Sequence, residues 1–387
     1  MKKPRKILSN RKTRGAPKKG QLPQMPQIKA IDSSGIRKII LKTTLSPGDL
    51  IMLSSAIRDL KVAHSNILID VRTTVPDIWD GNIYLTKLNE EDKDVEVINV
   101  EYPLINTSNS KPFHFIHGYR MFLEETLDLK IPQGDFRGYI PILEHEKTWM
   151  SQIQEMGVEE KYWLLFSGGK WDFTAKWWNP DEYQKVVDHF KDKILFVQCG
   201  ESNHYHPKLK NVINLIGKTN TRQLIRLMYH SIGVVCPVTF AMHLSRAVDT
   251  PRTAPVNRPC VVIAGGREPT HWEAYPTHKY LHQVGALACC ENGGCWRSRA
   301  FELGDGDEKD TSLCVDTVDL ERKIKTPKGN TVDLKIPKCL NMITHKHVIE
   351  AIESYYEGGV LSYGEGWNGS QSKLNKDKPK EDKPIDI

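Results

Sequence analysis

The chain has 387 residues, of which 39% are hydrophobic and 26% are charged, a balance that is ordinary for a soluble globular protein. Its length allows two domains, and its formal net charge is +6. No apolar run reaches the roughly 18–20 residues that a membrane-spanning helix needs, and the basic N-terminus lacks the apolar core of a secretory signal. We therefore expect a cytoplasmic protein without a membrane span.

Much of the positive charge lies at the N-terminus. Residues 1–20 contain nine lysines and arginines and no acidic residue. Such an arm can contact nucleic acid or an anionic surface, but a solvated, disordered segment over residues 1–35 is the simpler interpretation. Residues 363–387, rich in glycine, serine and lysine, are also expected to be disordered.

The first informative stretch runs from residue 37 to residue 60. An apolar run at 39–41 predicts a buried strand, and the sequence Ser-Pro-Gly-Asp at 46–49 predicts a tight turn. Apolar residues at helical spacing then predict a helix from Leu50 onward. A strand, a turn and a helix N-terminus in this order present free backbone N–H groups to a ligand. Asp49 is placed at this point, where the helix dipole favours its charged form.

Strands and helices alternate along the rest of the chain. The expected strands are 66–72, 94–100, 162–166, 194–198, 212–215, 232–236 and 259–264, and the expected helices are 115–127, 180–190, 221–230 and 344–356. This alternation predicts two doubly wound α/β domains with parallel sheets, over residues 36–155 and 156–285. Ligands bind beyond the carboxyl ends of such strands, so two facing domains would form a cleft for two substrates. A helix within 343–362 is expected to close the fold by packing back on the first domain.

The strand ends of the second domain carry residues suited to a nucleotide diphosphate. The segment Ser-Gly-Gly-Lys, which ends at Lys170, combines close backbone approach with a cation, and Lys176 follows it. Glu201 follows the next strand, where a carboxylate can bind ribose hydroxyls. Thr239 precedes a helix whose N–H groups can take a phosphate. Taken alone, Lys176 would be a surface lysine and His243 a core or capping histidine, but their shared position at strand ends favours a site.

In their order along the chain these motifs resemble glycosyltransferase family 9, the ADP-heptose lipopolysaccharide heptosyltransferases. The matching segments are Ser46-Pro-Gly-Asp49-Leu, Ala175-Lys-Trp-Trp-Asn-Pro180, Gly217-Lys-Thr-Asn-Thr-Arg-Gln-Leu224 and Thr239-Phe-Ala-Met-His-Leu244. The resemblance covers residues 37–285 and implies the GT-B fold, in which two Rossmann-like domains face a cleft. The family usually has Asp before the threonine of the last motif and Gly after it, where this chain has Val238 and Phe240.

The resemblance implies transfer of a sugar, possibly a heptose, from an ADP-heptose-like nucleotide donor to an acceptor hydroxyl. It gives Asp49 the role of the base that accepts the acceptor's proton. It implies that Lys176 contacts the donor phosphates, that Glu201 binds the ribose, and that Thr239 and His243 lie on the diphosphate loop.

Two further cations are candidates for stabilising the leaving diphosphate. Lys170 follows the first strand of the second domain, and Arg267 stands where the family has a different turn. The family works without a metal at the leaving group, so we expect none there, and positive side chains suit that position.

Five of the eight cysteines fall between residues 289 and 339. Disulfides are not expected in the cytoplasm, and four thiolates around a tetrahedral ion are the usual solution for zinc or iron. Reduced thiols without a metal are the alternative. However, segment 286–342 is poor in apolar residues, so a metal ion that cross-links it would be needed to stabilise its fold. The candidate ligands are Cys290, Cys295, Cys314 and Cys339. Similarity to autotransporter heptosyltransferases with a four-cysteine iron site also implies structural iron or zinc.

A second hypothesis is a non-catalytic nucleic-acid-binding protein that uses the basic arm and a zinc cluster. It accounts for the arm and the cysteines but not for the residues gathered at strand ends. A transferase whose acceptor is a glycan, a protein or a nucleic acid is compatible with both sets of features. The sequence leaves open the sugar, the nucleotide base, the acceptor, the metal and the oligomeric state.

Overall fold

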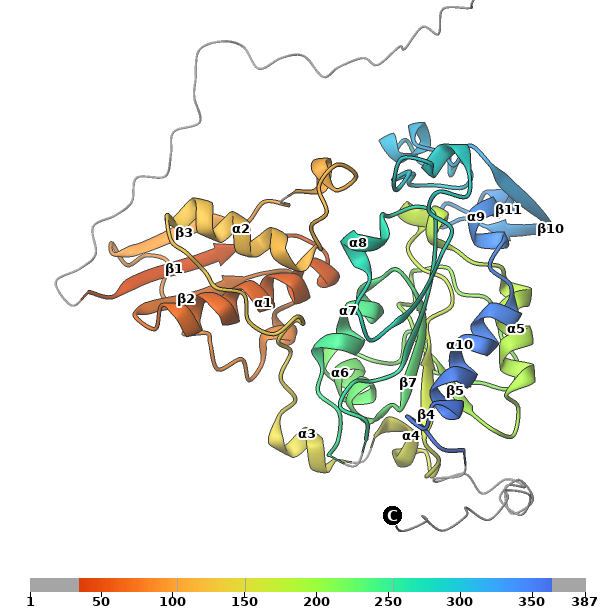
Figure 1. Cartoon of the computed structure of the whole chain (residues 1–387), viewed down its shortest axis with the longest axis horizontal. Helices are drawn as coiled ribbons and strands as arrows, with labels where there is room; N and C mark the ends of the chain where they lie inside the picture. The colour runs from red at the N-terminus through yellow and green to blue at the C-terminus, as the bar shows by residue number, and fades with distance from the viewer. Residues whose placement is uncertain (1–34, 103, 150, 253, 364–387) are drawn as a thin grey trace, which may run out of the picture.

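The computed structural model describes residues 35–102, 104–149, 151–252 and 254–363. Within these residues the chain forms two α/β halves, each built on a parallel sheet and drawn side by side in Figure 1. The arm expected before residue 35 and the tail expected after residue 363 lie outside the described residues. In the part of the chain that the structure covers, no helix is long and apolar enough to cross a membrane.

The N-terminal half contains a three-stranded sheet in the order β2-β1-β3. Its main elements are β1 (Arg37–Lys42), α1 (Pro47–Ala63), β2 (Ile67–Arg72), β3 (Val95–Asn99) and α2 (Ile116–Leu127), with 3-10 turns at Pro76–Trp79 and Ile105–Thr107. In the central strand, Ile40 stands opposite Asp70 of β2 and Val97 of β3, both in parallel register. Because β1 has a neighbour on each side, the loop that follows it opens at the topological switch point of this sheet.

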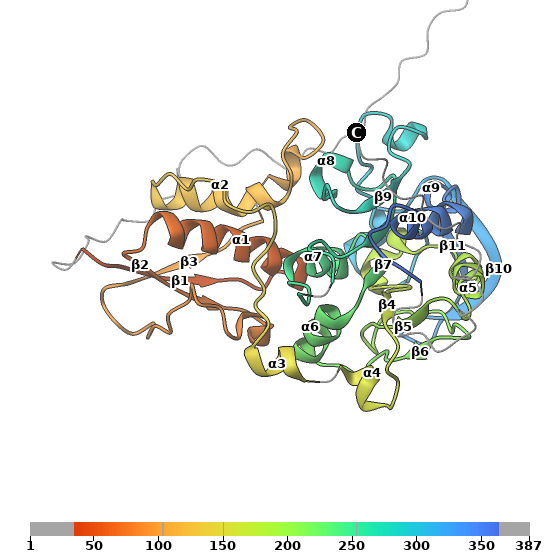
Figure 2. The same ribbon diagram turned by 60° about the horizontal axis from the view of Figure 1, so that its bottom comes forward.

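Helix α1 is buried along most of its length, from Asp49 to Leu60. It packs against α2 of its own half and against α7 (Phe240–Ala247) of the other half, and both views show α1 next to α7 (Figures 1 and 2). A surface helix would show one apolar stripe, whereas α1 is covered on several sides. Helix α1 therefore forms the core of the contact between the halves.

The C-terminal half contains a six-stranded parallel sheet in the order β6-β5-β4-β7-β8-β9. Two short helices, α3 (Glu144–Thr148) and α4 (Gln152–Glu155), lead into it. Its strands are β4 (Tyr162–Leu165), β5 (Leu195–Gln198), β6 (Ile213–Asn214), β7 (Gly233–Pro237), β8 (Cys260–Gly265) and β9 (Lys279–His282), and its other helices are α5 (Pro180–His189), α6 (Thr221–His230) and α8 (Thr270–Glu273), with a 3-10 segment at Trp171–Lys176. The winding reverses between β4 and β7, so the loops after these two strands meet at the switch point.

The two faces of this sheet carry different cores. Trp163 and Leu165 of β4 pack with α5 and α10 (His345–Glu357), whereas Leu164 packs with α6 and α7. Successive side chains of a strand point to opposite faces, and both faces are apolar because helices cover each of them. This burial on both sides explains why the strands are continuous apolar runs rather than alternating ones.

Apart from α1, the predicted strands and helices are confirmed within one or two residues of their expected ends, and α6 coincides with its prediction. Helix α1 begins at Pro47, three residues before the expected Leu50, so most of the turn predicted at 46–49 belongs to the first turn of the helix. One correction concerns the closing helix. Helix α10 packs on α5, β8 and β9 of the C-terminal half, not on the N-terminal half. Its buried residues Val348 and Ile352 join the core around Trp163, because the otherwise exposed face of the six-stranded sheet needs a cover.

A second correction concerns segment 286–342, which was expected to be poor in apolar packing. It contains the antiparallel hairpin β10 (Thr317–Lys325) and β11 (Thr331–Pro337), the short helix α9 (Lys338–Asn341), and 3-10 turns at Ala288–Cys290 and Glu308–Thr311. Leu334 is fully buried in a small core with Trp177, Phe301 and Leu303. Hydrophobic packing therefore stabilises part of this segment without any metal.

Candidate active site

Asp49 lies in the first turn of α1, at the end of the loop that follows β1. Its Oδ2 accepts hydrogen bonds from the backbone N–H of Ser46 at 3.1 Å and from the Ser46 hydroxyl at 2.7 Å. The side chain is buried, and burial raises its pKa from the usual value, while the hydrogen bonds from Ser46 and the charge of His243 act in the opposite direction. Asp49 thus caps its helix and also presents a carboxylate to the other half of the molecule.

His243, in α7, is the group of the C-terminal half that faces the start of α1. Its Nε2 lies 3.3 Å from Oε2 of Glu273, and its Nδ1 lies 3.0 Å from the hydroxyl of Tyr275. A Cβ atom on Gly48 would stand 3.4 Å from Cδ2 of the imidazole, so the glycine permits this close approach. The N-terminal turns of α1 and α7 therefore meet with a carboxylate on one side and an imidazole–carboxylate pair on the other.

Two tyrosines of the N-terminal half complete this cluster. Burial raises the pKa of Tyr102 far above its usual value, and the charges of Asp49, Glu273 and Glu268 raise it further. Burial and the charge of Asp49 do the same for the pKa of Tyr119. Both phenols therefore stay protonated and can donate hydrogen bonds to a carboxylate or a ligand oxygen.

A group of buried charges lies at the switch point of the six-stranded sheet. Nζ of Lys176 lies 2.7 Å from Oε1 of Glu268 and donates to the carbonyl oxygen of Val238, after β7, at 3.1 Å. The Arg267 guanidinium also binds Oε1 of Glu268. Burial raises the pKa of Glu268, but the neighbouring Arg267 and Lys176 outweigh it and hold the pKa below the usual value. Two cations thus converge on one ionised carboxylate, and the other oxygen of that carboxylate has no partner among the described residues.

The remaining predicted contacts lie around the same strand ends. Thr239 is the N-cap residue of α7, and its hydroxyl donates to the carbonyl of Pro237 at 3.4 Å rather than capping the helix. Lys170 and Glu201 are exposed. They flank the loop around Tyr205, whose backbone exchanges two hydrogen bonds with Gly169. A Cβ on the neighbouring Gly168, whose φ is +122°, would lie 2.0 Å from the Tyr205 carbonyl oxygen, which accounts for a glycine there.

The structure brings some predicted residues together and leaves others apart. Lys176 and Arg267 meet at Glu268, and His243 faces Asp49. Asp49 forms no hydrogen bond or ion pair with Lys176 in the part of the chain that the structure covers, and the charges of both Asp49 and Arg267 act on the pKa of the buried Tyr102.

Sequence reasoning missed Glu268, Glu273, Tyr102 and Tyr119. Glu268 had a signal, because it follows Arg267 in a glycine turn at a strand end. Tyr102 and Glu273 had none, because only the folded chain brings the loop after β3 and helix α8 next to α1.

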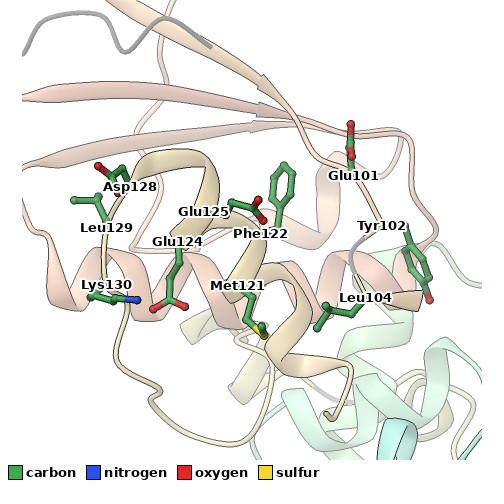
Figure 3. Close-up of a pocket in the computed structure, with 10 residues that line it drawn as sticks. All are labelled: Glu101, Tyr102, Leu104, Met121, Phe122, Glu124, Glu125, Asp128, Leu129 and Lys130. Atoms are coloured by element: carbon green, nitrogen blue, oxygen red, sulfur yellow. The ribbon is translucent and has the colours of Figure 1, made fainter. Parts of the chain in front are cut away.

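The two halves touch beside this cluster, so the crevice is partly filled. The backbone N–H of Phe115 donates to the carbonyl of Trp272 at 2.9 Å, and the two rings stack with centroids 5.3 Å apart. The Asn109 amide exchanges hydrogen bonds with the backbone of Gly294 at 2.7 and 2.9 Å. A pocket of about 710 Å³ lies on the N-terminal half, and Tyr102 lines it (Figure 3).

Two of the four candidate metal ligands, Cys290 and Cys339, lie beside a glycine pair at the end of β8. The Sγ of Cys290 would meet a Cβ on Gly266 at 3.0 Å, and the Sγ of Cys339 would meet one on Gly265 at 3.2 Å. Burial chiefly raises the pKa of Cys339 to about 12, and the charges of Cys314, Cys295 and Cys290 add to this rise. Among the described residues, however, no group of three or more such side chains is arranged as a metal site.

Comparison with known proteins finds a matching family and several similar structures. Residues 100–275 match the family described as glycosyltransferase family 9 (heptosyltransferase). No curated protein matches the chain. A glycosyltransferase of family 9 from Veillonella parvula DSM 2008 is similar in structure, with a TM-score of 0.56, 14% identity, and coverage of 83% of this chain and 97% of the other.

Two structures of TibC are similar as well. The iron-containing dodecameric glycosyltransferase TibC from enterotoxigenic E. coli H10407 has a TM-score of 0.52, 14% identity, and coverage of 84% of this chain and 78% of its own. TibC in complex with ADP-D-beta-D-heptose has a TM-score of 0.53, 15% identity, and coverage of 83% and 77%. At these identities the likeness shows the fold, which is the GT-B-like arrangement of two halves with parallel sheets.

Proposed function

We propose that the chain transfers a heptosyl group from ADP-heptose to an acceptor hydroxyl, because residues 100–275 match glycosyltransferase family 9 (heptosyltransferase). The observation that carries this proposal is the cluster at the two switch points, with Asp49 at one end and the cations Lys176 and Arg267 at the other. A non-catalytic nucleic-acid-binding role is set aside, because the matched family is a family of enzymes.

The proposed reaction needs a base at the acceptor end. The acceptor oxygen attacks the anomeric carbon, the bond from that carbon to the phosphate oxygen breaks, and ADP leaves. Asp49 takes the proton of the acceptor hydroxyl, for which it must be ionised. Its two hydrogen bonds from Ser46 and the nearby His243 favour the ionised form and also fix the carboxylate in place.

The donor end needs positive charge where the diphosphate leaves. Lys176 and Arg267 would contact the phosphates, together with the free N–H groups at the start of α7 after Thr239. Glu268 holds both cations in position, and its unpartnered oxygen is available to a donor hydroxyl. Lys170 and Glu201 would bind the outer part of the nucleotide.

The remaining proposed donor contact is His243, which lies in α7, the helix whose N-terminus would hold the diphosphate. In this proposal, residues 36–155 bind the acceptor and residues 156–285 bind the donor.

We also propose that Cys290, Cys295, Cys314 and Cys339 hold a structural iron or zinc ion. The Sγ atoms of Cys290 and Cys339 lie beside Gly266 and Gly265, and a set of four thiolates suits either ion. TibC is an iron-containing relative in fold. The ion would cross-link the loops after β8 to α9, and it takes no part in the transfer.

A thermal-shift panel of nucleotide sugars tests the donor assignment. A ligand that binds only the folded state stabilises it by about 2.7 kcal/mol at a concentration of 100 times Kd. We expect ADP-heptose and ADP to raise the melting temperature and UDP- or GDP-sugars to leave it unchanged. A shift with another nucleotide and none with ADP would reject ADP-heptose as the donor.

A further inference from the structure

The pocket on the N-terminal half is lined by two segments. The loop after β3 contributes Glu101, Tyr102 and Leu104, and α2 with the residues that follow it contributes the rest (Figure 3). The lining from α2 onward is Met121, Phe122, Glu124, Glu125, Asp128, Leu129 and Lys130. The pocket therefore combines an apolar wall with four carboxylates and a single cation.

Most of this negative charge is uncompensated. Glu124 accepts from Arg120 at 3.3 Å and from the backbone N–H of Ile131 at 2.9 Å, so its charge is satisfied. Glu101, Glu125 and Asp128 form no ion pair with any residue that the structure describes. Asp128 also stands at the C-terminal end of α2, where the helix dipole adds partial negative charge. The pocket thus attracts a cationic partner with apolar residues between its charges.

The chain itself contains such a partner. Residues 1–34 carry ten lysines and arginines against one acidic residue, Asp32, and apolar residues are interspersed among them. The described chain resumes beside the pocket: Arg37, the first residue of β1, donates to the carbonyl oxygen of Leu127 at 3.1 Å, immediately before Asp128. The eight residue-to-residue steps from Lys29 to Arg37 can span up to about 26 Å, and the stretch of α2 from Met121 to Leu127 is only about 9 Å long. The basic segment can therefore reach every part of the pocket.

We propose that this acidic pocket is the docking site of the chain's own N-terminal segment, residues 1–34. The lysines and arginines of the segment pair with Glu101, Glu125 and Asp128, and its apolar residues cover Phe122 and Leu129. Tyr102 belongs both to the pocket and to the Asp49 cluster, so the docked segment lies at the edge of the candidate active site. The proposal rests on charge complementarity and on the position of Arg37, and it does not depend on the identity of the donor.

Limited trypsin digestion of the full-length chain tests the proposal, because trypsin cleaves after lysine and arginine and docking protects those bonds. The pocket variant is Glu125→Gln/Asp128→Asn. The matched control is Glu159→Gln/Glu302→Gln, which removes the same charge from the C-terminal half. We expect the initial cleavage rate within residues 1–34 to rise roughly five-fold or more in the pocket variant, as for the loss of two ion pairs, and to stay unchanged in the control.

Salt at about 1 M, which screens charges beyond about 3 Å, should raise the rate for the unaltered chain to that of the pocket variant. Equal rates in both variants would overturn the proposal.

Carbodiimide cross-linking identifies the occupant directly, because it joins lysine amines to carboxylates in contact. In the full-length chain we expect links from lysines of residues 1–34 to Glu101, Glu125 or Asp128. A mixture of isotope-labelled and unlabelled chains should give links only within one isotope. Links that mix isotopes would assign the pocket to the arm of a second copy, and the absence of arm-to-pocket links would leave the pocket to an outside partner such as a basic acceptor. Either result would overturn the proposal.

Discussion

Replacement of Asp49 by asparagine separates the catalytic role of this residue from its capping role. Asparagine keeps an oxygen that can accept hydrogen bonds from Ser46, so α1 should still begin correctly. It cannot accept a proton from the acceptor. A positioned general base contributes about a hundred- to ten-thousand-fold to the rate, which corresponds to about 2.7–5.4 kcal/mol of activation free energy.

The effect on stability should be much smaller. Removal of the buried charge relieves its desolvation, and weaker hydrogen bonds from Ser46 offset part of that gain, so the free energy of unfolding should change by less than about 1 kcal/mol. Asp49→Ala should also lose the cap and destabilise the fold by about 1 kcal/mol more.

The assay measures release of ADP from ADP-heptose, with water or an added acceptor as the nucleophile, beside calorimetric binding of ADP. For Asp49→Asn we expect a loss of kcat, with Kd for ADP and the melting temperature nearly unchanged. An asparagine variant that retains kcat would refute the assignment of the base. A variant that loses ADP binding and folding together would make Asp49 a structural cap alone.

Three other outcomes follow from the same arrangement. Lys176→Gln should weaken ADP binding by about 10-fold or more, because a charged contact to the diphosphate is lost. Titration calorimetry should show a smaller loss for AMP, which lacks the second phosphate. Equal losses for both nucleotides would place Lys176 away from the second phosphate. Because burial raises the pKa of Asp49 above 3.8 and the base works ionised, kcat/KM should fall as the pH drops through a value above 3.8, and a profile that is flat down to pH 3.8 would contradict this. The same raised pKa means that Asp49 favours folding most at pH values below the unfolded pKa, and this contribution is lost as the pH rises through the folded pKa. Removal of the proposed ion by a chelator should lower the melting temperature and leave Cys295 open to thiol reagents, whereas a preparation that elemental analysis shows to be metal-free and equally stable would reject the ion.

Eight of the nine strands of the two parallel sheets were predictable because they are short apolar runs, whereas β9, a half-exposed edge strand without such a run, was missed. Burial by helices on both faces gives this pattern directly, as in β4 and β8. The hairpin β10–β11 was missed although Thr331–Pro337 alternates apolar and polar residues, which is the pattern of a half-buried strand.

The candidate site was only partly predictable. Asp49, Lys176 and Arg267 each follow a strand, and strand ends in parallel sheets gather at one edge, so local sequence was sufficient to find them. Their mutual positions were not predictable, because they depend on how α1 packs against α7. The buried partners Glu273 and Tyr102 come from segments without any local motif: the contact between the halves brings Glu273 to Asp49, and the fold of the N-terminal half brings Tyr102.

The most direct test of this account is an experimental structure of the chain with ADP bound. The account predicts that the diphosphate oxygens lie within hydrogen-bond distance of Lys176 Nζ and the Arg267 guanidinium, with the terminal phosphate directed toward Asp49. ADP bound at another edge of the sheet, with Lys176 and Arg267 still closed on Glu268, would contradict it.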